Sequence, residues 1–330
     1  MDPTEARFTF PNDISACHLC GSGTKDKLKR CTGCQVVMYC GKECQKKAWP
    51  MHKSVCRLRS DSTRSQRTGN IGPVSVDESR DRILKKLGFS SAVELGHAVI
   101  TWADWHKWAF SSLTKAAVML EGGPNAMRLQ TKNSKFVVFV ISPYRDTEIG
   151  SNPGNAFYVR SVSVNSSEDF DPASAPRRIW AGGEDARLKD MKVWRDGHCD
   201  PWFAGLVSLI FHVHDALGYD TGMVFYSTST LYHSPAPLPL SEFNVNVCRD
   251  VIGTIKGTMK GGAILQIKDQ DVVPTPGFLQ RKKRDWQWRS LFSVPGTLFL
   301  SWNHMGTFLP SFAMKSGLKP RAVMEHFATL

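Results

Sequence analysis

Long apolar runs are missing from this sequence. Its longest apolar stretch, residues 202–211, is about half of the roughly 18 residues that a membrane-spanning helix needs. The opening residues, MDPTEARFTFPND, also lack the basic-then-apolar order of a secretory signal peptide. We therefore expect no contact with a membrane and an intracellular location, in the nucleus or the cytoplasm, where thiols stay reduced.

Cysteine is scarce outside one short segment. Seven of the nine cysteines lie between Cys17 and Cys56, whereas Cys199 and Cys248 stand alone. Such clustering in a reducing compartment predicts metal binding rather than disulfide bonds.

A dense charge of one sign is also missing. The formal net charge is +12, and residues 1–60 contribute +6 of it. Seven cysteine thiolates and two divalent metal ions would lower this local charge to +3. The basic excess is therefore mild. Proteins that bind nucleic acid usually carry a dense basic face, so this charge does not indicate that function.

The cysteine-rich segment has the spacing of zinc ligands. Both sulfurs of a Cys-x2-Cys turn can reach one ion about 2.3 Å away, and ligands four residues apart lie one helical turn apart. Eight ligands fill two tetrahedral zinc sites with no open position, which predicts a structural rather than a catalytic metal. Spacing alone leaves open whether neighbouring or alternate pairs share an ion. The pairs are Cys17 with Cys20, Cys31 with Cys34, Cys40 with Cys44, and His52 with Cys56.

The order of these ligands, with Tyr39 before Cys40 and Trp49 before the last pair, closely resembles the MYND-type zinc finger. The resemblance covers residues 17–56 and implies a small cross-braced fold in which alternate pairs share an ion. One zinc would then be bound by Cys17, Cys20, Cys40 and Cys44. The other would be bound by Cys31, Cys34, His52 and Cys56.

The resemblance also implies a function. MYND fingers bind short peptide motifs, often proline-rich, in partner proteins, and many serve as adaptors or in transcriptional regulation. We therefore expect a zinc-dependent protein–protein interaction module whose folding free energy comes largely from its metal, on the order of 10 kcal/mol per site. The expected core residues are Val36, Val37, Met38 and Trp49, and the expected solvated face consists of Lys42, Lys46 and Lys47.

The rest of the chain has the pattern of a separate α+β domain, because its helix and strand candidates show little regular alternation. This domain resembles the uncharacterised regions attached to MYND fingers in some fungal proteins. The predicted parts are an N-terminal tail (1–13), the finger (14–58), a solvated linker (59–75) and the α+β domain (76–330).

Apolar periodicity and turn residues predict the elements of this domain. The expected helices are 77–87, 92–120 with a cap at Ser91, 200–218, 280–292 and 320–329. The expected strands are 127–131 and 136–141, paired as a hairpin, then 156–164, 223–227, 243–247, 263–267 and 297–302, with a loop over 165–200.

The helix expected over 200–218 bears on a possible metal site. Residues two apart on a helix diverge by about 200°, so His212 and His214 would not share a ligand there, whereas on a strand they would share one face. Because a helix is expected, these histidines are interpreted as core or boundary residues. His198, Cys199 and Asp200 are likewise not expected to form a catalytic group.

Two other functions fit parts of the sequence. MYND fingers also occur in SET-domain lysine methyltransferases, which carry SET sequence before the finger and an Asn-His-Ser-Cys motif after it. Only 16 residues precede Cys17, and residues 302–306, WNHMG, are the nearest match. We therefore predict no enzymatic activity and no catalytic residues.

The second alternative is a nucleic-acid-binding protein. Residues 280–289, QRKKRDWQWR, mix basic and aromatic side chains, as surfaces that stack bases can. A basic amphipathic helix with Trp286 and Trp288 partly buried is the favoured interpretation, so protein partners are expected rather than nucleic acid.

Overall fold

The computed structural model describes residues 28–32, 38–49, 78–129, 131, 133–144, 152–169, 180, 188, 192, 202–268, 271–283, 285–293, 302 and 314–330. The chain divides into two compact units, which are described separately. The larger unit includes residues 82–184 and 198–330, and the smaller unit includes residues 9–81. Helices and sheets both occur, which confirms the predicted α+β class.

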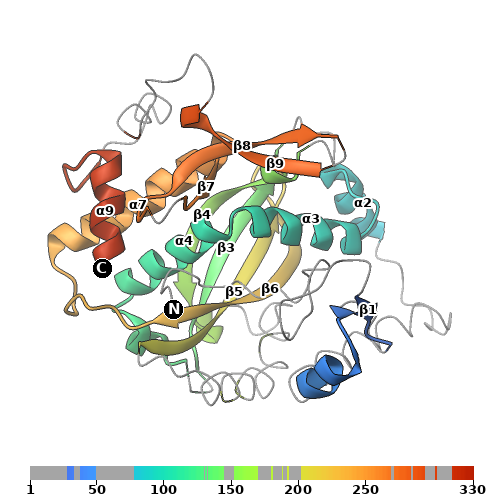
Figure 1. Cartoon of the computed structure of the whole chain (residues 1–330), viewed down its shortest axis with the longest axis horizontal. Helices are drawn as coiled ribbons and strands as arrows, with labels where there is room; N and C mark the ends of the chain where they lie inside the picture. The colour runs from blue at the N-terminus through green and yellow to red at the C-terminus, as the bar shows by residue number, and fades with distance from the viewer. Residues whose placement is uncertain are drawn as a thin grey trace. The chain divides into compact units, whose positions relative to one another are not determined.

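A mixed four-stranded sheet lies at the centre of the larger unit (Figure 1). Its strand order is β4-β3-β5-β6, in which β3 and β5 are parallel and the two outer pairs are antiparallel. The strands are β3 (Phe136–Pro143), β4 (Phe157–Asn165), β5 (Phe203–His214) and β6 (Asp220–Tyr232).

Helices and a second, three-stranded sheet lie beside the central sheet (Figure 1). The helices are α2 (Glu78–Leu87), α3 (Ala92–Trp105), α4 (Lys107–Leu120), α7 (Glu242–Lys260) and α9 (Pro320–Thr329). The second sheet consists of β7 (Ile264–Gln266), β8 (Thr275–Lys282) and β9 (Asp285–Ser290). Short 3₁₀ turns at Pro124–Met127, Pro153–Asn155, Ser167–Asp169 and Leu291–Ser293 connect these elements.

Aromatic side chains join helices α3 and α4 to one face of the central sheet. The ring of Phe110 from α4 meets Phe139 of β3 and Phe211 of β5 edge-on, with centroids 5.0 and 5.1 Å apart. Trp102 from α3 packs on Phe110 at 5.1 Å. These residues are all buried, so this contact forms the main core of the unit.

The opposite face of the sheet carries a second apolar cluster. Phe136, Val138, Ile210 and Trp180 form it, with Val140 and Val224 packed against it. Because successive side chains of a strand point to opposite faces, the residues of β5 next to Phe211 belong to this second face. His212 and His214 therefore lie on the sheet face opposite α3 and α4.

The predicted helix over 200–218 is wrong, because residues 203–214 form strand β5. This strand is paired along both edges and covered on both faces, so its apolar side chains show no alternation and resemble those of a buried helix. Gly218, which seemed to end a helix, lies instead in the turn after the strand, with φ of 98°.

The single helix predicted over 92–120 is two helices that meet at His106. The His106 ring is fully buried, and its Nε2 is 2.8 Å from the carbonyl oxygen of Gly154. The predicted cap is confirmed, since the Glu94 amide donates to the Ser91 hydroxyl over 3.2 Å. The Glu94 carboxylate bonds to the hydroxyl and amide of Ser90, which lowers its pKa.

Three other elements were predicted wrongly. Residues 243–247 belong to helix α7, whose buried residues Val247, Val251 and Ile255 recur every four positions. The basic segment 280–292 forms the β8–β9 hairpin, with Arg281 opposite Trp286, rather than a helix. Residues 124–127 form a 3₁₀ turn, so the expected hairpin before β3 is absent among the described residues.

Other predicted elements are confirmed. Helix 77–87 corresponds to α2, and helix 320–329 corresponds to α9. Strands 136–141 and 223–227 fall within β3 and β6, strand 156–164 overlaps β4, and strand 263–267 contains the shorter β7. The loop expected over 165–200 is not confirmed, because Asn165 ends β4, residues 167–169 form a 3₁₀ turn, and Trp180, Leu188 and Lys192 are helical. Of strand 297–302 only Trp302 is described.

His106 should make the larger unit sensitive to acid. Burial lowers the pKa of its imidazole from 6.5 to about 4, although the bond to Gly154 opposes this shift. The unfolded chain therefore binds the proton first, so stability that is present above pH 6.5 is lost as the pH falls towards 4. At pH 4 this loss amounts to about 3 kcal/mol of the free energy of unfolding. We expect it to be absent in His106→Gln, which keeps an N–H donor for Gly154.

Urea unfolding of the wild type and His106→Gln at pH 7 and pH 4 measures the difference. The control is His97→Gln, which removes an exposed histidine from helix α3 and should keep the wild-type pH dependence. Parallel pH dependence of all three proteins would contradict the assignment to His106.

Candidate functional site

The smaller unit contains a short β ladder followed by a helix. Strands β1 (Lys29–Arg30) and β2 (Met38–Tyr39) pair antiparallel, with Lys29 opposite Tyr39, and residues 42–49 are helical. Cys31 follows β1 and Cys40 follows β2, so these two cysteines lie at opposite ends of the ladder. Three residues of strand separate the ends, which is roughly 10 Å.

Cys40 and Cys44 are positioned to bind one metal ion. Their sulfur atoms are 3.4 Å apart, because Cys44 lies in the first helical turn after Cys40. Four sulfurs bound tetrahedrally at about 2.3 Å from zinc would lie about 3.8 Å from one another. The pair therefore fits two corners of a zinc site.

Cys31 lies in a different environment. Its side chain is buried, and the amide nitrogen of Gln45 is 3.9 Å from its sulfur. An N–H group directed at a thiolate stabilises the negative charge and orients the ligand. Gln45 follows Cys44 on the helix, so it links the helix to the other end of the ladder.

The remaining predicted ligands lie outside the described residues. They are Cys17, Cys20, Cys34, His52 and Cys56. The sequential and the alternate pairing both place Cys31 on a different ion from Cys40 and Cys44. The described cysteines therefore fit either pairing.

The described surface of this unit differs in part from the expected one. Tyr39 and Ala48 are buried, whereas the indole of Trp49 is 41% exposed, so the prediction of Trp49 as a core residue is wrong. Lys42, Lys46 and Lys47 are exposed, which confirms the predicted solvated face. The side chains of Val36, Val37 and Met38 lie outside the described part.

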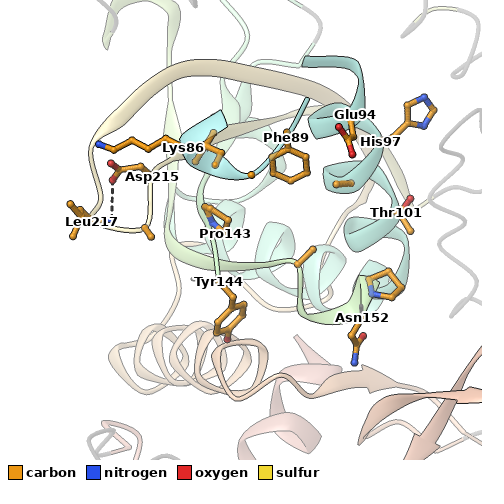
Figure 2. A pocket seen from close by; sticks show the side chains of 16 residues that line it. Lys86, Phe89, Glu94, His97, Thr101, Pro143, Tyr144, Asn152, Asp215 and Leu217 are labelled. Carbon is orange, nitrogen blue, oxygen red and sulfur yellow. Dashed lines mark hydrogen bonds between the residues drawn. The ribbon is translucent and has the colours of Figure 1, made fainter. Parts of the chain in front are cut away.

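The larger unit has a cavity of about 580 Å³. Figure 2 shows Phe89 and Pro143 near its middle, with Glu94 and Thr101 of α3 on one side and Lys86 on the other. Further lining residues come from the end of β3, the 3₁₀ turn Pro153–Asn155 and the turn between β5 and β6. A cavity of this size, mostly apolar with a few charged groups, suits a small ligand.

The β5–β6 turn forms a rigid wall of this cavity. Arg160 of β4 donates to the carbonyl oxygen of Ala216 over 2.9 Å and to the hydroxyl of Ser142 over 2.6 Å. The same hydroxyl donates to the carbonyl oxygen of Asp215 over 2.9 Å. One cation from β4 thus holds both the turn and the end of β3 in place.

The two carboxylates of the cavity, Glu94 and Asp215, both have a lowered pKa. Partial burial raises the pKa of Asp215, but amide bonds from Tyr219 and Leu217 and the charge of Lys86 outweigh this effect and lower it overall. Burial raises the pKa of Tyr144 to about 12, and its hydroxyl donates to backbone carbonyls of α7. The cavity therefore offers one ammonium and two carboxylates beside an apolar floor.

Comparison with known families decides the nature of the cysteine-rich segment. The family model described as the MYND finger matches residues 17–56. This segment is a MYND finger. MYND fingers bind zinc, and they are protein-interaction modules.

Several curated proteins are similar to the MYND finger region of this chain. Human histone-lysine N-methyltransferase SMYD3 is 54% identical over 41 residues, which are 12% of this chain and 9% of that protein. Histone-lysine N-methyltransferase ASHR1 of Arabidopsis thaliana is 44% identical over 48 residues, 14% of this chain and 10% of that protein. Dauer abnormal formation protein 25 of Caenorhabditis elegans is 39% identical over 70 residues, which are 21% of this chain and 17% of that protein.

These relatives correct one prediction. We predicted no enzymatic activity, and the names of the relatives as histone-lysine N-methyltransferases overturn that prediction. The match covers the MYND finger alone, and this chain matches about a tenth of the length of the first two relatives.

No solved structure matches the chain significantly. None of the described helices is long and apolar enough to cross a membrane.

Sequence reasoning identified the MYND finger but missed the groups in the larger unit. The cavity is lined by side chains from five separate segments, which no local pattern connects. The alternation His-x-His in a long apolar run was a usable signal for strand β5, because residues two apart share a face only on a strand. Asp220, which pairs with His212, is eight residues away and becomes a neighbour only through the β5–β6 hairpin.

Proposed function

We propose that this protein is a zinc-dependent protein-interaction module or adaptor, and that its MYND finger binds short proline-containing peptide motifs in partner proteins. The observation that carries the proposal is the family match over residues 17–56, which includes every predicted metal ligand. In the cell, such a module would act in the nucleus or the cytoplasm, for example in transcriptional regulation.

The proposal includes two zinc ions with alternate pairing of ligands. One ion is bound by Cys17, Cys20, Cys40 and Cys44, and the other by Cys31, Cys34, His52 and Cys56. Two centres are supported by the β1–β2 ladder, since Cys31 and Cys40 follow its opposite ends, roughly 10 Å apart. The ligands of one zinc lie within about 4 Å of one another, so one ion would not bridge both ends.

A closed zinc site has a structural role, so binding would occur on the surface that the metal shapes. Each ion has four protein ligands and no open position for a substrate. The half-exposed indole of Trp49 and the exposed lysines of the 42–49 helix are the described groups that could meet a peptide. An indole offers a large apolar face at low entropic cost, which suits proline rings.

The domain boundaries are part of this proposal. The finger extends over residues 14–58, after a tail of residues 1–13, and a linker of residues 59–75 joins it to the α+β domain of residues 76–330. A linker rich in Arg, Ser and Gly would let the two parts act separately.

A second candidate function is methyl transfer to lysine. It is favoured by the names of two relatives, which are histone-lysine N-methyltransferases, and it rests on the finger region alone. The larger unit has a cavity of about 580 Å³, which is large enough for a small cofactor.

The pairing of ligands can be tested by replacing zinc with ¹¹³Cd. Both pairings predict two signals, one from a site with four sulfurs and one from a site with three sulfurs and a nitrogen. With alternate pairing, Cys44→Ser shifts or removes the all-sulfur signal, and Cys31→Ser affects the other signal. The reverse result would show sequential pairing, and a single signal in the wild type would contradict two sites.

Binding of peptides should depend on zinc and on Cys40. We expect Cys40→Ser, or a strong chelator, to abolish binding to an array of short proline-containing peptides, because each site contributes on the order of 10 kcal/mol to folding of the finger. Zinc added back after chelation should restore binding. Cys248→Ala is the control, since Cys248 is buried in helix α7 of the larger unit. Equal binding by chelated and zinc-loaded wild type would contradict the proposal.

The second candidate is tested with radiolabelled S-adenosylmethionine and histones. If the cavity holds the methyl donor, the full chain should label histone lysines, and Ala98→Trp should reduce labelling at least 10-fold by filling the cavity. Val93→Trp is the control, because Val93 lies on the exposed side of the same helix. No labelling by the zinc-loaded wild type would exclude this candidate and leave the interaction module.

A further inference from the structure

The end of the β5–β6 hairpin brings two histidines and an aspartate together. His212 and His214 share one face of β5, and Asp220 begins β6 opposite His214. Their ligand atoms all lie within 4.8 Å of one another. From this geometry we propose that His212, His214 and Asp220 form a binding site for a divalent transition-metal ion, separate from the MYND finger.

The two closest ligand atoms already face each other. Nε2 of His212 is 2.6 Å from Oδ1 of Asp220, and the rings of His212 and His214 are nearly perpendicular, with centroids 4.8 Å apart. Nitrogen and oxygen ligands at about 2.0 Å from a tetrahedral ion would lie about 3.3 Å apart. Small side-chain rotations would therefore bring all three atoms onto one ion, which would replace the proton between His212 and Asp220.

A hydrogen bond outside the group sets the tautomer of His214. Nδ1 of this ring is 2.9 Å from the carbonyl oxygen of Gly218, and a carbonyl can only accept. Nδ1 therefore carries the hydrogen, and in the neutral ring Nε2 has the lone pair that a metal needs. Metal-binding histidines in proteins commonly have such a backbone or carboxylate partner on the other nitrogen.

The carboxylate is also held in position. Oδ1 of Asp220 accepts a hydrogen bond from the Gly222 amide over 2.7 Å. The register of the hairpin shifts between Val213 and His214, and Gly222 has φ of 66°, so the backbone bulges here. The Thr221 hydroxyl donates to the Val213 carbonyl oxygen over 2.5 Å and fixes this bulge. Bulges of this kind re-aim side chains next to functional sites.

The group is covered on one side and open on the other. Val140 and Val224 lie beside His212 in the neighbouring strands, at the edge of the second apolar cluster. The Asp220 side chain is 57% exposed, whereas that of His212 is 16% exposed. Three protein ligands with solvent on one side leave at least one coordination position for water or a substrate oxygen.

The ligand types narrow the identity of the ion. Two imidazoles and one carboxylate suit zinc, iron, cobalt or nickel in the divalent state, whereas magnesium and calcium prefer oxygen ligands alone. The MYND finger sites, by contrast, have at least three sulfurs each. The two kinds of site can therefore be distinguished by the absorption of bound Co²⁺, because only sulfur ligands add strong charge-transfer bands.

The test is a Co²⁺ titration of the full chain with its finger loaded with zinc. We expect one additional Co²⁺ per chain, with visible absorption but no sulfur charge-transfer band. Asp220→Asn and His214→Asn should weaken this binding at least 10-fold. His233→Asn, a change in the loop after β6, is the matched control and should bind Co²⁺ as the wild type does.

Three results would overturn the site. They are no Co²⁺ uptake beyond the finger, uptake with a sulfur band, and equal affinity in wild type and Asp220→Asn. Asp220 is exposed, so its isosteric replacement should leave the hairpin folded, which far-UV circular dichroism checks. If His212 and Asp220 form only an ion pair, the variants would change thermal stability equally with and without Co²⁺, and this result would also overturn the site.

Discussion

Strand β5 is hydrogen-bonded along both edges, in parallel to β3 and antiparallel to β6, and the larger unit is organised around it. On one face it presents Phe211 to the aromatic core beneath α4. On the other face it carries Ile210 and the two histidines. The turn that follows it forms a wall of the cavity, so the core, the cavity and the His–His–Asp group all depend on the register of this one strand.

The MYND finger and the proposed hairpin site would have opposite physical roles. The MYND finger is too small to bury much apolar surface, so its fold is expected to depend on metal, with all of its proposed ligands in closed sites. The hairpin of the larger unit is held by strand pairing without any metal, and the three proposed ligands would leave a coordination position open. A closed site shapes a surface for partners, whereas an open site can bind a further ligand.

Helix ends that are marked by a capping residue, a glycine or a proline were predicted correctly from the sequence. The Ser91 cap marks the start of α3 and Gly88 follows the end of α2, as predicted, and Pro320 begins α9 as expected. Helix α7 was missed because its sequence NVNV alternates like a strand, although its buried residues recur every four positions. The β8–β9 hairpin was missed because its basic turn lacks glycine, and Lys283 adopts φ of 57° instead.

The sequence by itself determined the MYND finger, since metal ligands are recognised by residue type and spacing, and both lie within 40 residues. It did not determine the secondary structure of residues 203–214, because a run that is apolar on all sides fits a buried helix and a central strand equally well. Only the pairing with β3 and β6 decided between them. That pairing also brought Asp220 to His212, a contact that depends on tertiary register and has no local signature.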